Sequence, residues 1–257
     1  MKAVILAGGL GTRLSEETAL RPKPMVEIGG RPILWHIMKI YAAYGVNDFI
    51  ICCGYKGDVI KEYFANYHMH NSDMTFDLSN GQVVFHRRGS ESWRVTLVST
   101  GDATLTGGRL LRVASHIRDE EAFFFTYGDG VGNVDIAASL AFHKAHGKAA
   151  TLTAAFAPGR FGALTIEDGR ISTFEEKPKG DGAMINAGFF VLSPSVLREI
   201  DGDSTTWEQE PLRRLAAAGQ LMAFEHREFW QPMDTLRDKQ VLEGLWAGGK
   251  APWKIWT

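Results

Sequence analysis

The chain has 257 residues, of which 45% are hydrophobic and 23% are charged, so one α/β domain can bury a sizeable core and extensive disorder is excluded. The formal net charge of −2 at pH 7 and the lack of a basic block exclude a nucleic-acid binder. The sequence has no apolar run of membrane-spanning length and no signal-peptide pattern at its start, so we expect a cytoplasmic protein without a membrane partner.

Strand-like and helix-like segments alternate through the first part of the chain. The predicted strands are residues 3–6, 49–53, 122–127 and 151–155, and the predicted helices are 33–44, 58–67, 108–116 and 135–146. Such alternation implies right-handed crossovers and a parallel sheet covered on both faces. Cys52 and Cys53 are adjacent in a strand and point to opposite faces, so we expect reduced core cysteines rather than a disulfide or a metal pair.

Two regions depart from this alternation. Residues 68–98 contain short alternating runs that predict a small insertion of antiparallel strands. Beyond Pro158 the chain becomes richer in strands. The elements expected there are strands at 162–166, 170–175 and 187–192 and helices at 208–218 and 235–246. We see no linker, so we expect a single domain over residues 1–257.

A glycine-dense loop, Gly8-Gly9-Leu10-Gly11, follows the first predicted strand. Its backbone N–H groups can face phosphate oxygens, and Arg13 and Lys23 add two cations. The Gly-Lys-Ser/Thr ending of a Walker loop is absent, and Leu14 stands where a dinucleotide-binding loop needs its third glycine. Lys23 lies between two prolines that fix its backbone, which suits charge stabilisation. The alternative is a tight turn with two solvated cations.

Two acidic residues lie next to later predicted elements and are candidate metal ligands. Asp129 lies between two glycines directly after the strand at 122–127, at the edge of an open α/β sheet where ligands bind. It can approach a phosphate-bound cation, and hard oxygen ligands favour Mg²⁺. Asp234, before the predicted helix 235–246, is the candidate for a second carboxylate. For both residues the alternative is a helix N-cap.

Two further segments are candidates for ligand contacts. The polar loop from Thr104 to Arg109 enters a helix, and its hydroxyls, amides and guanidinium could contact a base edge or a ribose. A plain helix-entry loop fits the same composition. Lys177 is held before Pro178 at a strand end, and the alternative there is a solvated turn.

Together these motifs resemble the sugar-1-phosphate nucleotidylyltransferase superfamily over essentially the whole chain. The residues that carry the resemblance are Leu6 to Leu14, Pro22-Lys23-Pro24, Gly128-Asp129, Glu176-Lys177-Pro178 and Asn186-Ala187-Gly188. It implies an α/β fold with a Rossmann-like, mostly parallel sheet covered by helices and a small β-rich insertion at about residues 68–98. Residues 1–150 would mainly bind nucleotide, and residues 151–257 would mainly bind sugar phosphate.

The resemblance also implies roles for individual residues. Arg13 and Lys23 would be the catalytic cations on a triphosphate, and Asp129 with Asp234 would hold Mg²⁺. The implied nucleotide-binding residues are Leu6, Ala7, Gly8, Gly9, Leu10, Gly11, Thr12, Arg13, Lys23, Thr104, Arg109 and Gly128. The implied sugar-phosphate-binding residues are Gly162, Glu176, Lys177 and Asn186.

Two departures point to one branch of the superfamily. Uridylyl and thymidylyl relatives usually carry a Gln-rich, Pro-Leu-Gly-type base loop where this chain has residues 104–109. The opening motif also lacks the common Pro-Leu-Thr after Arg-Leu and has Ser15-Glu16-Glu17-Thr18 instead. Both differences resemble the cytidylyl branch, which implies CTP and glucose 1-phosphate as substrates. UTP or dTTP remains an alternative, as does a nucleotide-binding module without turnover. Leu14 disfavours a dinucleotide-dependent oxidoreductase, as does the lack of an acidic residue after the second strand.

Three tryptophans, Trp246, Trp253 and Trp256, lie near the end of the sequence. They can pack on their own subunit or on a neighbouring one. Relatives in the superfamily commonly form oligomers, so we expect a homo-oligomer, with the insertion at 68–98 as a second candidate for subunit contact.

Overall fold

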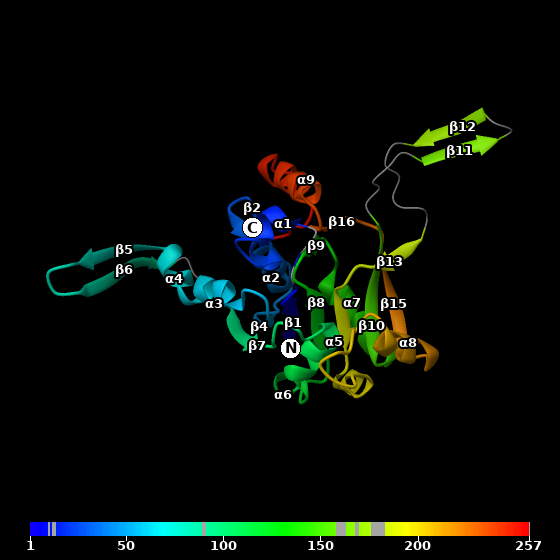
Figure 1. Cartoon of the computed structure of the whole chain (residues 1–257), viewed down its shortest axis with the longest axis horizontal. Coiled ribbons are helices and arrows are strands. Elements are labelled where there is room, and N and C mark those ends of the chain that lie inside the picture. Colours follow the sequence, from blue (N-terminus) through cyan, green and yellow to red (C-terminus); the bar gives the residue numbers. More distant parts are fainter. Residues whose placement is uncertain are drawn as a thin grey trace.

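The computed structural model describes residues 1–9, 11, 14–88, 91–157, 163–167, 170–175 and 183–256. Four parallel strands form one half of a central sheet (Figure 1). In spatial order they are β8 (Phe123–Tyr127), β1 (Lys2–Ala7), β4 (Asp48–Cys53) and β7 (Arg94–Ser99). Their carboxyl ends meet at one edge of the sheet, where the loops that follow β1 and β8 lie side by side.

The other half of the sheet is mixed. β14 (Phe190–Leu192) runs antiparallel to both β8 and β10 (Ala150–Phe156), so β10 points in the same direction as β8. β13 (Met184–Asn186) also runs antiparallel to β10, and β15 (Leu221–His226) runs parallel to it. All but two of these strands therefore share one direction, which confirms the mostly parallel sheet.

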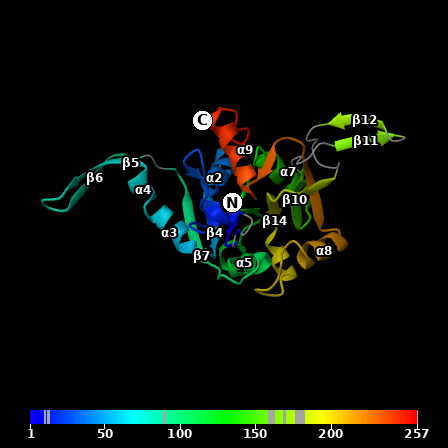
Figure 2. The same cartoon turned by 45° about the horizontal axis from the view of Figure 1, so that its top comes forward.

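Helices cover both faces of the sheet (Figure 2). The helices are α1 (Ser15–Thr18), α2 (Ile33–Ala43), α3 (Gly57–Ala65), α4 (Tyr67–His70), α5 (Thr106–Arg112), α6 (Ala114–Ile117), α7 (Ile136–His146), α8 (Glu210–Ala217) and α9 (Leu236–Ala247), with 3₁₀ turns at Lys23–Met25 and Pro194–Glu199. The strands that form separate two-stranded sheets are β2 (Glu27–Ile28), β3 (Arg31–Pro32), β5 (Ser72–Asp77), β6 (Gln82–Arg88), β9 (Gly130–Gly132), β11 (Ala163–Glu167), β12 (Arg170–Glu175) and β16 (Trp230–Pro232). Within the described residues, no helix combines the length and the apolarity needed to cross a bilayer.

Strand periodicity divides the apolar residues between two cores. On β1, Ile5 faces the core that contains α2, whereas Val4 and Leu6 face the core that contains α5. Cys53 and Cys52 face these same two cores, and both are free and buried, as predicted. Burial raises the pKa of the Cys53 thiol to about 11, which keeps it protonated and unreactive.

The predicted insertion at residues 68–98 is partly wrong. β5 and β6 do form a protruding antiparallel hairpin (Figure 1). However, β7 at residues 94–99 belongs to the central sheet, where it pairs in parallel with β4. β7 has no other strand partner in the described part of the sheet, and its residues are only partly covered. An edge strand of this kind shows the alternating pattern of a half-exposed hairpin strand instead of the continuous apolar run of a central parallel strand.

The aromatic residues near the end of the chain pack on their own subunit around His36. This imidazole is fully buried, and its Nε2–H donates to the Ile28 carbonyl at 2.8 Å. Its Nδ1 accepts the indole N–H of Trp253 at 3.3 Å, which fixes the neutral tautomer. Trp246 and Trp256 contact the same ring. Burial lowers the pKa of His36 to about 4, because protonation at Nδ1 would place a charge in this apolar cluster.

The buried imidazole predicts a loss of stability in acid. Above pH 6.5 His36 is neutral in both states, whereas between pH 6.5 and about pH 4 only the unfolded chain takes up a proton. At pH 4 this group should lower the free energy of unfolding by about 3 kcal/mol relative to pH 7.5. Urea unfolding of the wild type and of His36→Gln at both pH values measures the difference. The variant should lose less stability on acidification, while His116→Gln, at an exposed position, should match the wild type. Equal losses in wild type and His36→Gln would contradict the assignment.

Candidate active site

A cavity of about 260 Å³ opens at the carboxyl ends of β1 and β8. Both strand ends, the glycine loop and the 3₁₀ turn contribute to its wall. The lining residues are Leu6, Ala7, Gly9, Gly11, Lys23, Pro24, Thr106, Tyr127, Gly128 and Asp129. Four residues of the first strand end and the glycine loop, together with Lys23, therefore share one hollow with Tyr127, Gly128 and Asp129, which lie more than 100 positions later in the sequence.

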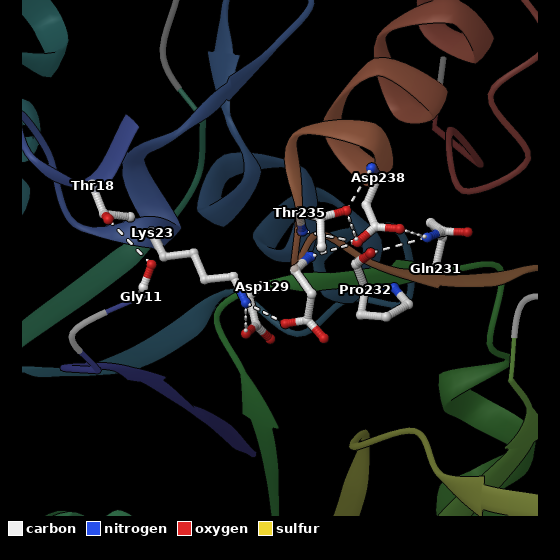
Figure 3. A network of polar contacts seen from close by, with 9 residues as sticks. Gly11, Thr18, Lys23, Asp129, Gln231, Pro232, Thr235 and Asp238 are labelled. Atoms are coloured by element: carbon white, nitrogen blue, oxygen red, sulfur yellow. Dashed lines mark hydrogen bonds and ion pairs between the residues drawn. The ribbon is translucent and has the colours of Figure 1, made fainter. Parts of the chain in front are cut away.

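Lys23 lies between two carboxylates (Figure 3). Its side chain is nearly buried, and Nζ donates to Asp129 Oδ2 at 2.7 Å and to Asp234 Oδ1 at 2.6 Å. Burial alone would lower the pKa of Lys23, but the attraction of Asp129 and Asp234 outweighs burial and raises that pKa above its ordinary 10.5. The ammonium group is therefore charged at neutral pH.

The pairing of two short strands brings the two carboxylates together. Asp129 follows β8, and the chain continues directly into β9, which pairs antiparallel with β16. The N–H of Met233 donates to the Asp129 carbonyl at 2.8 Å, so Asp234 comes next to Asp129. No helix follows Asp129, so its N-cap alternative is wrong. Gly128 is needed because a Cβ there would lie 2.5 Å from the Leu6 carbonyl oxygen.

Asp234 is not the cap of the last helix either. The N-cap of α9 is Thr235, whose hydroxyl accepts the Asp238 N–H in a capping box. Asp238 in turn accepts the N–H groups of Asp234 and Thr235 at 3.1 and 2.9 Å (Figure 3). Because Asp238 satisfies the helix end, the carboxylate of Asp234 is directed to Lys23 instead.

The two carboxylates fit a hard divalent cation. Because Lys23 Nζ lies 2.7 Å from one oxygen and 2.6 Å from the other, those oxygens are at most 5.3 Å apart. A positive charge already lies between them. The part of the chain that the structure describes contains no group of three or more His, Cys, Asp and Glu side chains suited to a metal. Two carboxylates with water and phosphate as further ligands are the usual environment of Mg²⁺.

The described part of the glycine loop is held from both ends. Gly11 has a φ of +64°, and its carbonyl accepts the Leu14 N–H and the Thr18 hydroxyl. A Cβ on Gly9 would meet nothing within 4 Å, so that residue faces open space. Leu14, at the position of the missing third glycine, is a fully buried core residue. Leu10, Thr12 and Arg13 lie outside the described residues.

The glycines of the second predicted loop have a packing role. Gly107 and Gly108 donate their N–H groups to the Thr205 carbonyl, and a Cβ on Gly108 would lie 2.5 Å from the backbone of Asp203. They therefore allow α5 to approach the loop that contains residues 203–207. Thr106 begins α5 and lines the cavity. Thr104, two positions earlier, is buried and is not among the lining residues.

This close approach predicts a measurable cost for Gly108→Ala. The added methyl group would meet backbone atoms, which cannot rotate away, so we expect a loss of about 1–3 kcal/mol in the free energy of unfolding. Urea denaturation measures it. Gly244→Ala is the matched control, because a Cβ there meets nothing within 4 Å inside α9. That change should be neutral or stabilising, and equal losses in both variants would contradict the packing role.

Arg109 lies beneath the glycine loop with 4% of its surface exposed. Its guanidinium donates to the Gly8 carbonyl at 3.0 Å, to the Thr100 hydroxyl at 2.8 Å and to the Asp102 carbonyl at 3.2 Å. A Cβ on Gly8 would lie 2.1 Å from the same guanidinium. Arg109 thus joins the loops that follow β1 and β7.

Asn186 ends β13 and contacts the cavity residue Tyr127. Its Nδ2 donates to the Tyr127 hydroxyl at 3.2 Å, and its Oδ1 accepts the Gly188 N–H at 2.8 Å. The other predicted sugar-phosphate residues, Gly162, Glu176 and Lys177, lie outside the described residues.

Sequence reasoning missed Thr106 and Tyr127 as cavity residues. Tyr127 immediately precedes Gly128-Asp129 at the end of a strand of phenylalanines. Its hydroxyl, placed directly before the predicted ligand-binding residues Gly128 and Asp129, was the available signal. Thr106 was inside the predicted polar loop but was not distinguished from its neighbours.

A parallel sheet edge that joins a glycine loop, a buried lysine and two carboxylates is the kind of arrangement with which nucleotide-dependent α/β proteins bind phosphate. Comparison with known proteins narrows the class. The chain belongs to the Nucleotidyl transferase family, whose match covers residues 2–235.

Two relatives and one solved structure illustrate the similarity. The chain is 70% identical over 256 residues to glucose-1-phosphate cytidylyltransferase from Salmonella typhi, with all of both chains covered. It is 47% identical over 257 residues to the probable glucose-1-phosphate cytidylyltransferase of Bacillus subtilis, again with full coverage. A putative glucose-1-phosphate thymidylyltransferase from Bacillus anthracis, solved in complex with sucrose, superposes with a TM-score of 0.69 at 19% identity, covering 98% of this chain and 95% of that one. The structural match supports the fold, and the sequence matches support the family.

Proposed function

We propose that this nucleotidyl transferase moves CMP from CTP to α-D-glucose 1-phosphate, giving CDP-glucose and pyrophosphate. The observation that carries the proposal is the position of Lys23 between Asp129 and Asp234 at the glycine-loop edge. In a chain 70% identical to a glucose-1-phosphate cytidylyltransferase over its whole length, this is the arrangement that such a transfer needs.

The reaction forms one P–O bond and breaks another. A phosphate oxygen of glucose 1-phosphate attacks the α-phosphorus of CTP in line, and the bond to the bridging oxygen of pyrophosphate breaks. The nucleophile is already an anion, so no general base is required. The protein must hold two highly charged substrates together and offset the charge that develops on pyrophosphate.

Cations of this chain meet that requirement. Lys23 and Arg13 would bind the triphosphate and offset the charge of the leaving pyrophosphate, and Lys177 would reduce repulsion at the attacking phosphate. Asp129 and Asp234 would hold Mg²⁺, which when bound supplies positive charge to the phosphate oxygens. Lys23 would then turn from these carboxylates to the triphosphate.

The choice of CTP rests on the 70% identity to a glucose-1-phosphate cytidylyltransferase over the whole chain. The loop at residues 104–109 supports it, because this loop lacks the Gln-rich pattern usual in uridylyl and thymidylyl relatives. Arg109 would act from below the nucleotide loop, since its guanidinium donates to the Gly8 carbonyl and is itself buried. A uridylyl- or thymidylyltransferase acting on the same sugar phosphate is the second candidate.

Pyrophosphate release tests the proposal. CTP, UTP, dTTP, ATP and GTP are each combined with glucose 1-phosphate, mannose 1-phosphate and galactose 1-phosphate, with and without Mg²⁺. We expect release above background only with Mg²⁺ and fastest from CTP with glucose 1-phosphate. Release from UTP alone would overturn the base assignment, and no release from any pair would overturn the enzyme assignment.

The assembly and compartment are part of the same proposal. The β5–β6 hairpin extends from the body (Figure 1) and exposes Phe76, Leu78 and Val84, which are 52%, 92% and 50% accessible. A two-stranded hairpin is marginally stable alone, and a second copy of the chain would cover its apolar surface. We therefore propose a homo-oligomer, tested by light scattering of the wild type and of Leu78→Ser.

The triphosphate and sugar phosphate are intracellular metabolites, so we place the reaction in the cytoplasm.

A further inference from the structure

A chain of polar groups connects α5 to β13 beside the cavity. It runs from Trp207 through Thr106, Glu208 and Tyr127 to Asn186. Thr106 and Tyr127 line the cavity directly. The proposed roles above do not use Tyr127 or Glu208, and the direction of each hydrogen bond in the chain can be deduced.

The Asn186 end fixes the role of the Tyr127 oxygen. Oδ1 of Asn186 accepts the Gly188 N–H at 2.8 Å, so the amide orientation is determined by the backbone. The NH₂ group of Asn186 therefore faces Tyr127 and donates to its hydroxyl oxygen at 3.2 Å. Gly188 has a φ of +74°, which sets this turn. The Tyr127 oxygen is thus an acceptor toward Asn186, and its own proton must point elsewhere.

The Glu208 end fixes the direction of that proton. The Thr106 oxygen accepts the Trp207 N–H at 2.9 Å, so its own proton is donated to Glu208 Oε2 at 2.6 Å. The charge of Glu208 also acts on the Tyr127 hydroxyl, and because a carboxylate only accepts hydrogen bonds, the phenol O–H is the donor toward it. Burial, and then the Glu208 charge, raise the pKa of Tyr127 well above its ordinary value. Tyr127 remains a neutral phenol whose O–H is directed to Glu208.

This arrangement gives the cavity wall a particular polarity. With its O–H directed to Glu208, the Tyr127 oxygen has only acceptor capacity left for a ligand in the cavity, and the charge of Glu208 adds negative potential. Phosphate oxygens, which lack protons at neutral pH, are disfavoured at such a position. A substrate hydroxyl, which can donate, is favoured.

We infer that Tyr127 accepts a hydrogen bond from a sugar hydroxyl of a substrate and that Glu208 is the residue that positions and polarises it. The inference rests on the proposed function. The hydroxyl belongs either to the ribose of the nucleotide or to the hexose of the sugar phosphate, because Tyr127 lies between the α5 side of the cavity and Asn186.

Substrates that lack one hydroxyl at a time test the inference with Tyr127→Phe and Glu208→Gln. The measured quantity is the ratio of kcat/KM for the hydroxyl-bearing substrate to kcat/KM for its deoxy analogue. Analogues of CTP lack the 2′- or 3′-hydroxyl, and analogues of glucose 1-phosphate lack the 2-, 3-, 4- or 6-hydroxyl. For one hydroxyl we expect a wild-type ratio of about tenfold, the effect of one hydrogen bond to a polarised acceptor, and a ratio near one in Tyr127→Phe. Glu208→Gln should lower the same ratio.

The pattern of ratios decides the outcome. A loss confined to a CTP analogue identifies the ribose, and a loss confined to a glucose 1-phosphate analogue identifies the hexose. A general structural defect would lower all rates equally and leave every ratio at its wild-type value, which would overturn the inference. If Tyr127→Phe does not fold, Glu208→Gln decides alone. Tyr44→Phe, on the opposite core, is the control and should leave all ratios unchanged. Absence of wild-type turnover would instead overturn the proposed function.

Discussion

Replacing Lys23 with alanine is expected to lower turnover by about 10²–10³-fold, the effect of removing one group that stabilises transition-state charge. Lys23 is the described cation closest to both site carboxylates, and its pairing with Asp129 and Asp234 holds it at the cavity. Steady-state pyrophosphate release with saturating CTP and glucose 1-phosphate measures the effect. Because the contact develops on the leaving pyrophosphate, kcat should fall more than KM rises.

A control variant and a metal-binding measurement accompany the Lys23→Ala experiment. Lys144→Ala removes an exposed lysine from its ion pair with Glu121 and should keep wild-type turnover. In Lys23→Ala the two carboxylates lose the cation between them. Mg²⁺ without nucleotide should therefore raise its melting temperature more than that of the wild type. A folded Lys23→Ala variant with near-wild-type turnover would remove Lys23 from its proposed role.

Asp129→Ala should produce a loss of similar size, again about 10²–10³-fold in turnover. The substitution leaves Asp234 as the remaining one of the two carboxylates that would hold Mg²⁺, so the concentration of Mg²⁺ needed for half-maximal rate should rise as well. Mg²⁺ titrations of pyrophosphate release measure both effects.

Asp135→Ala is the matched control for this variant. Asp135 is an exposed carboxylate that caps α7 by accepting the Ala138 N–H at 2.8 Å. Its loss should cost about 1 kcal/mol of stability but leave turnover and the Mg²⁺ requirement unchanged. If Asp129→Ala kept the wild-type Mg²⁺ dependence, the proposed metal site would be wrong.

The sequence predicted the main sheet and the meeting of the loops that contain Lys23 and Asp129, because loops after parallel strands gather at one edge. The place of Asp234 beside them was implied only by the family resemblance, and no sequence pattern predicted how Asp234 reaches that edge. The pairing of β9 with β16 joins segments about 100 residues apart and consists of two three-residue strands, which are too short to give a periodic signal.

The glycines at 107 and 108 show a second limit of prediction from the sequence. In the sequence they resemble a ligand-binding loop, but their partner is the backbone of residues 203–205, which no local pattern connects to them. β7 shows a third limit. Its partly covered edge position produces the alternation of a hairpin strand, so its place in the parallel sheet depends on tertiary contacts with β4.

The central claim is that an oxygen of the sugar phosphate attacks the α-phosphorus of CTP. Glucose 1-phosphate carrying ¹⁸O in its three non-bridging phosphate oxygens tests this claim, with products followed by ³¹P NMR. We predict equal amounts of CDP-glucose and pyrophosphate, with all of the label in CDP-glucose, including the oxygen between its two phosphorus atoms, and none in pyrophosphate. Label in pyrophosphate or in inorganic phosphate, or a sugar nucleotide without the labelled bridge, would contradict the claim.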